Sequence, residues 1–234
     1  MRQIVLDTET TGLEPELGHR VIEIGGVELV NRRLTGNNFH RYLNPERDSE
    51  AAALEVHGLT TEFLRDKPKF SDIAGEFLDF IGGAELIIHN SAFDVSFLDR
   101  ELDLAGLKPL AEYCSGVIDT LRMARELHPG KRNALDALCE RYQIDNSART
   151  LHGALLDARL LGEVYLAMTR GQESLIMDVE STAATAAAGE ASLAGLELVV
   201  QVAHAEELAA HRERLAEIDA ASKGACLWYK LEKP

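Results

Sequence analysis

The chain has 234 residues, of which 46% are hydrophobic, and a formal net charge of −15 at pH 7. This length and composition allow one well-buried domain of roughly 150–200 residues with an appendage. The charge argues against an autonomous nucleic-acid binder, because such proteins usually place Lys and Arg against phosphates. Nucleic-acid binding would therefore require bound cations, or a partner protein that supplies most of the affinity.

The sequence shows neither a targeting segment nor a cysteine pattern typical of disulfides or zinc sites. No signal peptide opens the chain and no run of 18 apolar residues interrupts it, so we expect a cytoplasmic protein with no membrane partner. Cys114, Cys139 and Cys226 lie far apart, which favours buried thiols over a disulfide framework or a zinc site.

Apolar runs predict a three-stranded meander at the start of the chain. Its strands are expected at Gln3–Leu6, Val21–Val30 and Asn38–Leu43, with residues 31–36 connecting the last two. Later strands are expected at Glu85–His89 and Gly116–Asp119, and helices at Ala51–Glu55, Ser71–Ile81, Ala92–Leu104, Thr120–Leu127, Asn133–Tyr142 and His152–Met168. This order predicts an α/β fold with a mixed sheet flanked by helices on both faces.

The composition changes after Met168. Residues 178–195 are mostly Ala, Ser, Thr, Gly and Glu, which predicts a flexible linker, although an Ala-rich helix is an alternative there. Beyond the linker, Glu206–Ala220 is expected to form an amphipathic helix in a segment too small to fold alone. The predicted organisation is a domain at 1–170, a short motif at 171–177, the linker, and a C-terminal segment at 196–234.

Acidic residues stand at three separated places in the predicted domain. Asp7 and Glu9 follow the first strand, and the period of two puts both on one side of an extended chain. Asp94 falls in the first turn of a helix, where its simplest role would be to complement the helix dipole. His152 and Asp157 lie near the start of the long apolar helix. A carboxylate on so apolar a helix requires a partner, either a metal ion or a hydrogen-bonding network.

Four carboxylates and one imidazole are the groups that two-metal phosphodiester hydrolysis requires. Carboxylate oxygens are preferred ligands of Mg²⁺ and Mn²⁺. One ion lowers the pKa of the attacking water, and a second, about 3.5–4 Å away, stabilises the charge on the leaving oxygen. A histidine with an ordinary pKa near ~6.5 can accept the proton of that water at neutral pH.

In order and spacing, Asp7-x-Glu9, Asn90-x-x-Phe93-Asp94 and His152-x-x-x-x-Asp157 resemble the three motifs of the DEDDh family of 3′-5′ exonucleases. The resemblance implies a ribonuclease H-like fold and two bound divalent cations, Mg²⁺ or Mn²⁺. It also implies the role of each group. Asp7 would bridge the two ions, Glu9 and Asp157 would complete the tighter site, Asp94 would support the second ion through water, and His152 would be the general base.

Residues 2–169 further resemble one branch of that family, the epsilon or proofreading subunits of bacterial DNA polymerase III. In these proteins a segment similar to Val56-His57-Gly58-Leu59 contacts the terminal nucleotide, so Val56 would act as a wedge and His57 as a base or sugar contact. Ala52 stands where an acidic nucleotide contact is expected. The substrate-binding residues implied by the resemblance are Thr8, Thr10, Gly12, Val56, His57, Asn90 and Phe93.

The tail resembles the partner-binding regions of the same subunits. The hexapeptide at residues 172–177 resembles a motif that docks on the sliding clamp (beta), and its contact residues would be Gln172, Ser174, Leu175 and Met177. The C-terminal segment resembles a tail that binds the catalytic (alpha) subunit of the polymerase, because aromatic anchors are typical of interfaces. Its expected contacts are Leu208, Leu215, Trp228 and Tyr229. A small theta-like subunit is a further partner in this comparison.

The predicted function is removal of mispaired 3′-terminal nucleotides, as 5′-monophosphates, from single-stranded or frayed DNA. Two alternatives stay open. An RNA-trimming exoribonuclease of the same family would carry the same motifs, but such chains usually have no polymerase-binding tail. A non-catalytic adaptor between polymerase and clamp would not need the complete set of acids.

Overall fold

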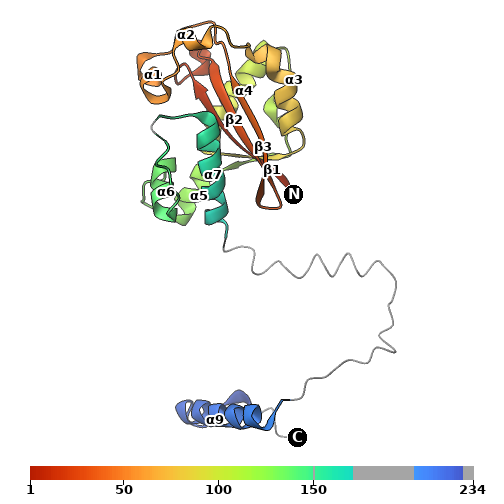
Figure 1. Cartoon of the computed structure of the whole chain (residues 1–234), viewed down its shortest axis with the longest axis vertical. Coiled ribbons are helices and arrows are strands. Elements are labelled where there is room, and N and C mark those ends of the chain that lie inside the picture. Colours follow the sequence, from red (N-terminus) through yellow and green to blue (C-terminus); the bar gives the residue numbers. More distant parts are fainter. Residues whose placement is uncertain (150, 171–202, 229–234) are drawn as a thin grey trace, which may run out of the picture. The chain divides into compact units, whose positions relative to one another are not determined.

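The computed structural model describes residues 1–149, 151–170 and 203–228 (Figure 1). The chain divides into two units, Met1–Asp178 and Val179–Pro234. The first unit contains the predicted mixed sheet and its helices. The second contains helix α9 (Ala205–Ala221).

A five-stranded sheet in the order β3-β2-β1-β4-β5 forms the centre of the first unit. Its strands are β1 (Arg2–Thr10), β2 (Val21–Val30), β3 (Arg33–Tyr42), β4 (Glu85–Ile88) and β5 (Gly116–Asp119). β1, β2 and β3 pair antiparallel, whereas β4 is parallel to both β1 and β5. The predicted meander and mixed sheet are confirmed. Because β1, β4 and β5 are parallel, their carboxyl ends meet at one edge of the sheet.

The connection between β2 and β3 is shorter than predicted. β3 begins at Arg33, which pairs with Val30, so only Asn31 and Arg32 form the turn. Both turn residues have positive φ, 48° and 62°, as a two-residue type I′ hairpin requires. The expected connection at residues 31–36 was wrong because the first part of β3 is exposed and therefore carries no apolar pattern.

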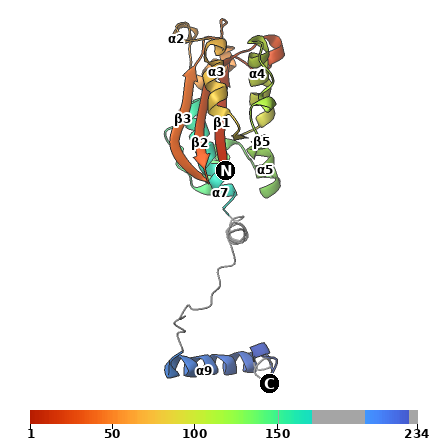
Figure 2. The ribbon, with the colours of Figure 1, turned by 90° about the vertical axis from the view of Figure 1, so that its right-hand side faces the viewer.

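Helices cover both faces of the sheet, as predicted (Figure 2). Ile4 and Leu6 of β1 belong to one buried cluster, with residues of α3 and α4, whereas Val5 belongs to a second cluster with residues of α6 and α7. The helices are α1 (Ala51–His57), α2 (Thr61–Leu64), α3 (Phe70–Ile81), α4 (Ser91–Leu104), α5 (Thr120–Leu127), α6 (Leu135–Tyr142) and α7 (Ala154–Met168), with 3₁₀ turns η1 (Pro15–Leu17) and η2 (Leu110–Glu112). Helix α2, too short to show a period, was not predicted.

A glycine allows α7 to approach the sheet at the level of the first acidic residue. Gly25 of β2 pairs with Asp7 of β1. A Cβ atom on Gly25 would lie 2.2 Å from backbone atoms of Ala154 and Leu155, in the first turn of α7. Only a residue without a side chain permits this contact. The start of α7 is thereby placed directly beside Asp7.

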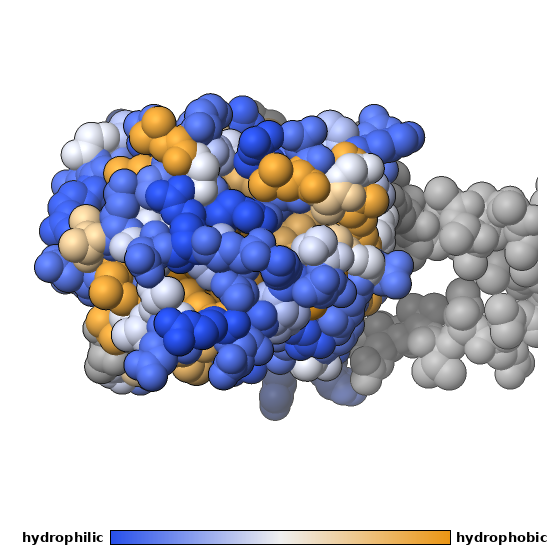
Figure 3. All heavy atoms as spheres, turned by 90° about the horizontal axis from the view of Figure 1, so that it is seen from above, coloured by the Kyte–Doolittle hydropathy of each residue, from blue (hydrophilic) through white to orange (hydrophobic). Residues whose placement is uncertain are grey.

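The surface of the first unit seen in Figure 3 is mostly hydrophilic, with hydrophobic side chains in separate patches.

In the second unit, α9 confirms the helix predicted at Glu206–Ala220. Its Leu215 is buried, whereas Leu208 of the same helix and Trp228 are 44% and 61% exposed. The linker at 178–195, the hexapeptide at 172–177 and Tyr229 lie outside the described residues. Among the helices described, none has the length and apolar character needed to cross a membrane.

Candidate active site

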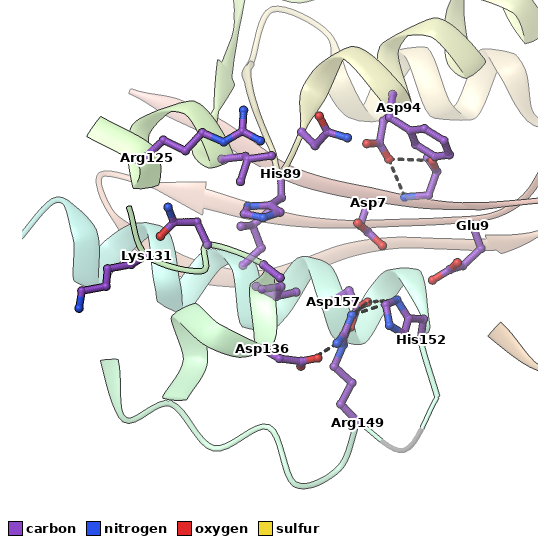
Figure 4. Close-up of a pocket in the computed structure, with 18 of the residues that line it drawn as sticks. Asp7, Glu9, His89, Asp94, Arg125, Lys131, Asp136, Arg149, His152 and Asp157 are labelled. Atoms are coloured by element: carbon purple, nitrogen blue, oxygen red, sulfur yellow. Dashed lines mark hydrogen bonds and ion pairs between the residues drawn. The ribbon is translucent and has the colours of Figure 1, made fainter. Parts of the chain in front are cut away.

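A cleft of about 670 Å³ opens where β1 and β4 end (Figure 4). The structure brings all the predicted catalytic residues to it. Two come from the end of β1, one from α4, one from the segment before α7 and one from α7 itself: Asp7, Glu9, Asp94, His152 and Asp157. Three segments that are far apart in the sequence therefore contribute to one cavity.

Helix α7 begins two residues later than predicted. Gly153 is its N-cap, and the backbone N–H of His152 donates to Val56 O, 3.1 Å away at the end of α1. This contact to another element draws His152 out of the helix. Asp157 consequently lies in the first turn of α7 and not deeper inside, where the positive end of the helix dipole favours its negative charge.

The alternation along β1 assigns its side chains to opposite faces of the sheet. Thr8 follows Leu6 toward α4, where its Oγ1 and backbone N–H donate to Asp94 Oδ1 over 2.7 and 3.1 Å. Asp7 and Glu9 follow Val5 toward α7. One face of the strand end thus supplies two carboxylates to the cleft, and the other face holds the carboxylate of Asp94, which comes from α4.

The donor atoms fit a divalent cation. Glu9, His152 and Asp157 each offer a ligand atom, and these atoms lie within 4.8 Å of one another. Asp7 adds a further carboxylate to the same cleft. Oxygen donors with a single imidazole are suited to hard or borderline cations such as Mg²⁺ and Mn²⁺.

Burial and mutual repulsion raise the pKa values of three carboxyl groups in the cleft, those of Asp7, Glu9 and Asp94. Burial, with the charges of Asp157 and Glu23, raises the pKa of Glu9 to about 8. Burial raises the pKa of Asp94 to about 7. The pKa of Asp7 also lies well above its ordinary value, through burial and then through Asp94 and Glu9. A cation bound among these groups would favour their ionised forms.

Arg149 binds the acidic residues in this structure. Its Nε and Nη2 donate to the two oxygens of Asp157 over 2.6 and 2.7 Å, and its Nη1 donates to Asp136 Oδ1 over 2.7 Å. Nη2 also lies 3.0 Å from Nδ1 of His152. The side chain of Arg149 is only 6% exposed. Neither Arg149 nor Asp136 was predicted. The sequence did indicate that the carboxylate of Asp157 needs a partner, and an arginine meets that need as well as a metal ion does.

A smaller hollow of about 300 Å³ adjoins the cleft and shares Thr8, Glu9 and Phe93 with it. Most residues predicted to contact the substrate line this hollow, namely Thr8, Thr10, Gly12, Val56, His57 and Phe93, whereas Asn90 lines the larger cleft. Ala52 lines the hollow as well. A carboxylate is nevertheless present there, because Glu50 lines the same wall, with its Oε1 3.0 Å from His19 Nε2.

His57 holds a proton donor without a partner. Its Nδ1 accepts the backbone N–H of Leu59 over 2.9 Å, so the ring proton lies on Nε2. Nε2 is buried and has no hydrogen-bond partner among the described residues. Because an unpaired buried donor costs about 1–3 kcal/mol, an acceptor on a ligand in this hollow would recover that free energy.

Cationic side chains lie at the far end of the cleft and were not predicted. Arg125 of α5 and Lys131, from the connection between α5 and α6, line the same cavity as the acids. Figure 4 shows them at the end opposite to Glu9 and His152. The sequence feature that could have indicated this basic region is the pair of adjacent basic residues Lys131 and Arg132, which follows Gly130 in a strongly acidic chain.

A family model described as Exonuclease (RNase_T) matches residues 4–165. The chain is 52% identical over 238 residues to the DNA polymerase III subunit epsilon of Escherichia coli (strain K12), covering 97% of each chain. It is 49% identical over 243 residues to that of Haemophilus influenzae, covering 98% of this chain and 95% of the relative. The chain belongs to the family of DNA polymerase III epsilon subunits. As a member of the epsilon family it is a proofreading 3′-5′ exonuclease, and the predicted family is confirmed.

Solved structures agree with the fold of the epsilon family. Exonuclease X in complex with 5′ overhanging duplex DNA matches with a TM-score of 0.57 at 23% identity, over 73% of this chain and 92% of that chain. Exonuclease I matches with a TM-score of 0.62 at 17% identity, over 74% of this chain and 42% of that chain. The predicted ribonuclease H-like exonuclease fold is therefore confirmed.

Proposed function

We propose that this epsilon-family exonuclease hydrolyses the mispaired 3′-terminal nucleotide of single-stranded or frayed DNA to a 5′-monophosphate, by a two-metal mechanism. The observation that supports it is the meeting of Asp7, Glu9, Asp94 and Asp157 beside His152 in one cleft, next to a second hollow that can receive a terminal nucleotide. Mispaired ends are preferred because an unpaired nucleotide costs less to unstack.

The carboxylates Asp7, Glu9, Asp94 and Asp157 would hold two divalent cations, Mg²⁺ or Mn²⁺. Ions bound there would lower the pKa of a water molecule and stabilise the charge on the leaving 3′ oxygen. His152 would accept the proton of the attacking water. Burial, followed by the charge of Arg149, lowers its pKa, so the imidazole is neutral at pH 7.

The hydrogen bond from Arg149 controls which nitrogen of His152 can act as the base. While Arg149 donates to Nδ1, the ring proton resides on Nε2. Proton transfer to Nε2 therefore requires that Arg149 release Nδ1. Asp157 Oδ2, 3.6 Å from Nδ1, is then available to accept an N–H from it.

The smaller hollow would receive the terminal nucleotide. Val56, 43% exposed on its wall, would act as the wedge. The unpaired Nε2–H of His57 would donate to an oxygen of the base or sugar. Thr8, Thr10, Gly12 and Phe93 would complete the nucleotide contacts, and Asn90 would contact the strand from the larger cleft.

The tail would recruit this exonuclease to the replicative polymerase. Exposure of Leu208 and Trp228 supports contact with the alpha subunit of DNA polymerase III, together with Tyr229. Leu215 is buried and would support the helix that presents them. Gln172, Ser174, Leu175 and Met177 would bind the beta clamp, and a theta-like subunit would bind the catalytic domain. Tethering raises the local concentration at the primer end, which compensates for the net charge of −15.

The decisive measurement is nucleotide release from matched and mismatched 3′ ends, with Mn²⁺ or with EDTA. We expect faster release from mismatched ends, none in EDTA, and none from the Asp7→Asn variant. Asp66→Asn, which neutralises an exposed carboxylate outside the cleft, is the matched control and should keep full activity. Full activity of Asp7→Asn would refute the site. Faster hydrolysis of an RNA oligomer would favour an exoribonuclease, and polymerase binding without hydrolysis would favour an adaptor.

A further inference from the structure

We propose that Arg125 and Lys131 bind phosphates of the substrate strand on the 5′ side of the scissile bond. This assignment rests on the proposed function and adds to it the direction in which the strand lies. Its ligand is the phosphodiester backbone of single-stranded DNA, independent of base sequence.

Both side chains are free to bind an anion. They are exposed and line the catalytic cleft. Within the ranges that the structure describes, neither cationic group has a hydrogen bond or an ion pair with a side chain. Arg149, the other strong cation of the cleft, differs because Asp157 and Asp136 already occupy its guanidinium. Arg125 and Lys131 are therefore the cations that a phosphate can reach without displacing a carboxylate.

The segment that carries Lys131 is held in place by hydrogen bonds. The backbone N–H of Lys131 donates to His128 O over 3.2 Å, and His128 Nε2 lies 2.7 Å from the hydroxyl of Tyr142. Arg141 of α6 donates to Arg132 O over 2.8 Å, directly after Lys131. A phosphate contact built on such a fixed segment costs less ordering entropy on binding.

The order of the cavities gives the strand its direction. The hollow proposed for the terminal nucleotide meets the cleft at Thr8, Glu9 and Phe93. Arg125 and Lys131 lie at the other end, with the acidic residues between (Figure 4). A strand whose 3′ nucleotide occupies the hollow and whose scissile phosphate lies over the acids must continue toward Arg125 and Lys131.

These two cations also address the conflict between the acidic chain and its substrate. The net charge of −15 repels DNA at long range. Two unpaired cations inside the cleft supply local attraction where the strand passes. For single strands, each neutralised phosphate contributes about 0.7 to the slope of log K against log salt. Two contacts therefore predict a contribution of about 1.4.

The test compares two double variants of the full-length protein that change the net charge equally. Arg125→Gln/Lys131→Gln removes the proposed contacts. Arg122→Gln/Arg132→Gln is the matched control, because both residues are exposed on α5 or beside Lys131 and neither lines the cleft. Each is assayed with Mn²⁺ on a single-stranded oligonucleotide and on the p-nitrophenyl ester of thymidine 5′-monophosphate, which has no upstream strand.

We expect Arg125→Gln/Lys131→Gln to raise KM for the oligonucleotide about tenfold at low salt and to lower the salt slope by about 1.4. Hydrolysis of the ester should stay at the unsubstituted rate, which also shows that the variant is folded. An oligonucleotide KM and salt slope equal to those of the control would overturn the assignment. Failure of the unsubstituted protein to hydrolyse the ester would instead count against the proposed function.

Discussion

Arg149 occupies the oxygen atoms of Asp157 that a divalent cation bound at the proposed site would require. The guanidinium occupies both oxygens in a bidentate pair in which the two side chains are 6% and 3% exposed. Such a pair is shorter and stronger than neutral hydrogen bonds. Arg149 therefore neutralises Asp157 in this structure; an ion bound to Asp157 would have to replace it, and release of Arg149 would also free Nδ1 of His152.

Replacing Arg149 with glutamine should destabilise the protein without ions more than with them. Breaking one side of a buried ion pair costs about 3–5 kcal/mol, which corresponds to a decrease in Tm of roughly 6–20 °C for a domain of this size. A bound ion compensates Asp157 and should restore most of the loss. Thermal unfolding in EDTA and in Mn²⁺ measures the loss of stability and its recovery. Arg159→Gln, at an exposed position on α7, is the control. An equal decrease in the Tm of Arg149→Gln in both media would contradict competition between Arg149 and an ion for Asp157.

The four acidic residues and His152 could be predicted because their order and spacing can be read directly from the sequence. The residues that form hydrogen bonds with them could not be predicted. Arg149 lies outside the motifs and reaches Asp157 through the segment before α7. His57 was predicted, but the proton on its Nε2 depends on the backbone N–H of Leu59, which donates to Nδ1, a contact that the sequence does not show.

At the level of elements, the position of α7 depends on the absence of a side chain at Gly25. The helix carries Asp157 in its first turn, and its start lies against the strand pair that carries Asp7. A shift of α7 away from the sheet would therefore separate two carboxylates that are proposed to hold the same cations.

Gly25→Ala should reduce both stability and nuclease activity. The new Cβ would meet the backbone of Ala154 and Leu155 at 2.2 Å, and a helix backbone cannot yield as a side chain can. Overpacking of this kind costs about 1–3 kcal/mol, and about 1 Å of displacement in a catalytic group can lower the rate 10²-fold. Chemical denaturation and oligonucleotide hydrolysis check the two effects. Gly75→Ala is the control because nothing lies within 4 Å and alanine favours its helix; activity of Gly25→Ala equal to that of Gly75→Ala would disprove the role of close packing.

Most strands and helices with a buried face were predicted closely, because burial imposes a period on the sequence. β1 is longer than expected, since it continues to Thr10 through polar residues that carry no apolar pattern. The other exceptions lack a buried face or depend on another element. The exposed start of β3 and the single turn of α2 carry no pattern. Helix α7 begins late because His152 bonds to the end of α1, a contact between residues that are distant in sequence.

For the whole molecule, the raised pKa values predict that the free energy of unfolding without ions decreases as the pH rises. The additional stability that bound ions provide should increase over the same pH range. The pKa of Glu9 rises from 4.5 to about 8 on folding. Between these values the folded state keeps a proton that the unfolded state has lost. The contribution of Glu9 is therefore fully present below pH 4.5 and is lost as the pH rises through about 8. Ions bind the ionised carboxylates, so their stabilising effect should increase over the same range.

Unfolding free energies in EDTA and in Mg²⁺ between pH 5 and 9 would check this dependence. In EDTA the free energy of unfolding should decrease with pH, and in Glu9→Gln the decrease should be smaller. In Mg²⁺ the difference from the EDTA curve should widen as the pH rises. A Glu9→Gln curve parallel to that of the unsubstituted protein would exclude Glu9 as the source.

The two hydrophobic cores lie on opposite faces of the sheet, and each positions one of the helical carboxylates. Asp94 belongs to α4, which packs on one face, and Asp157 belongs to α7, which packs on the other. Cations held between them would link the two helical layers at the edge of the sheet. Ion binding would then slow amide hydrogen exchange in both helices at once, so the catalytic site would also stabilise the packing of the domain.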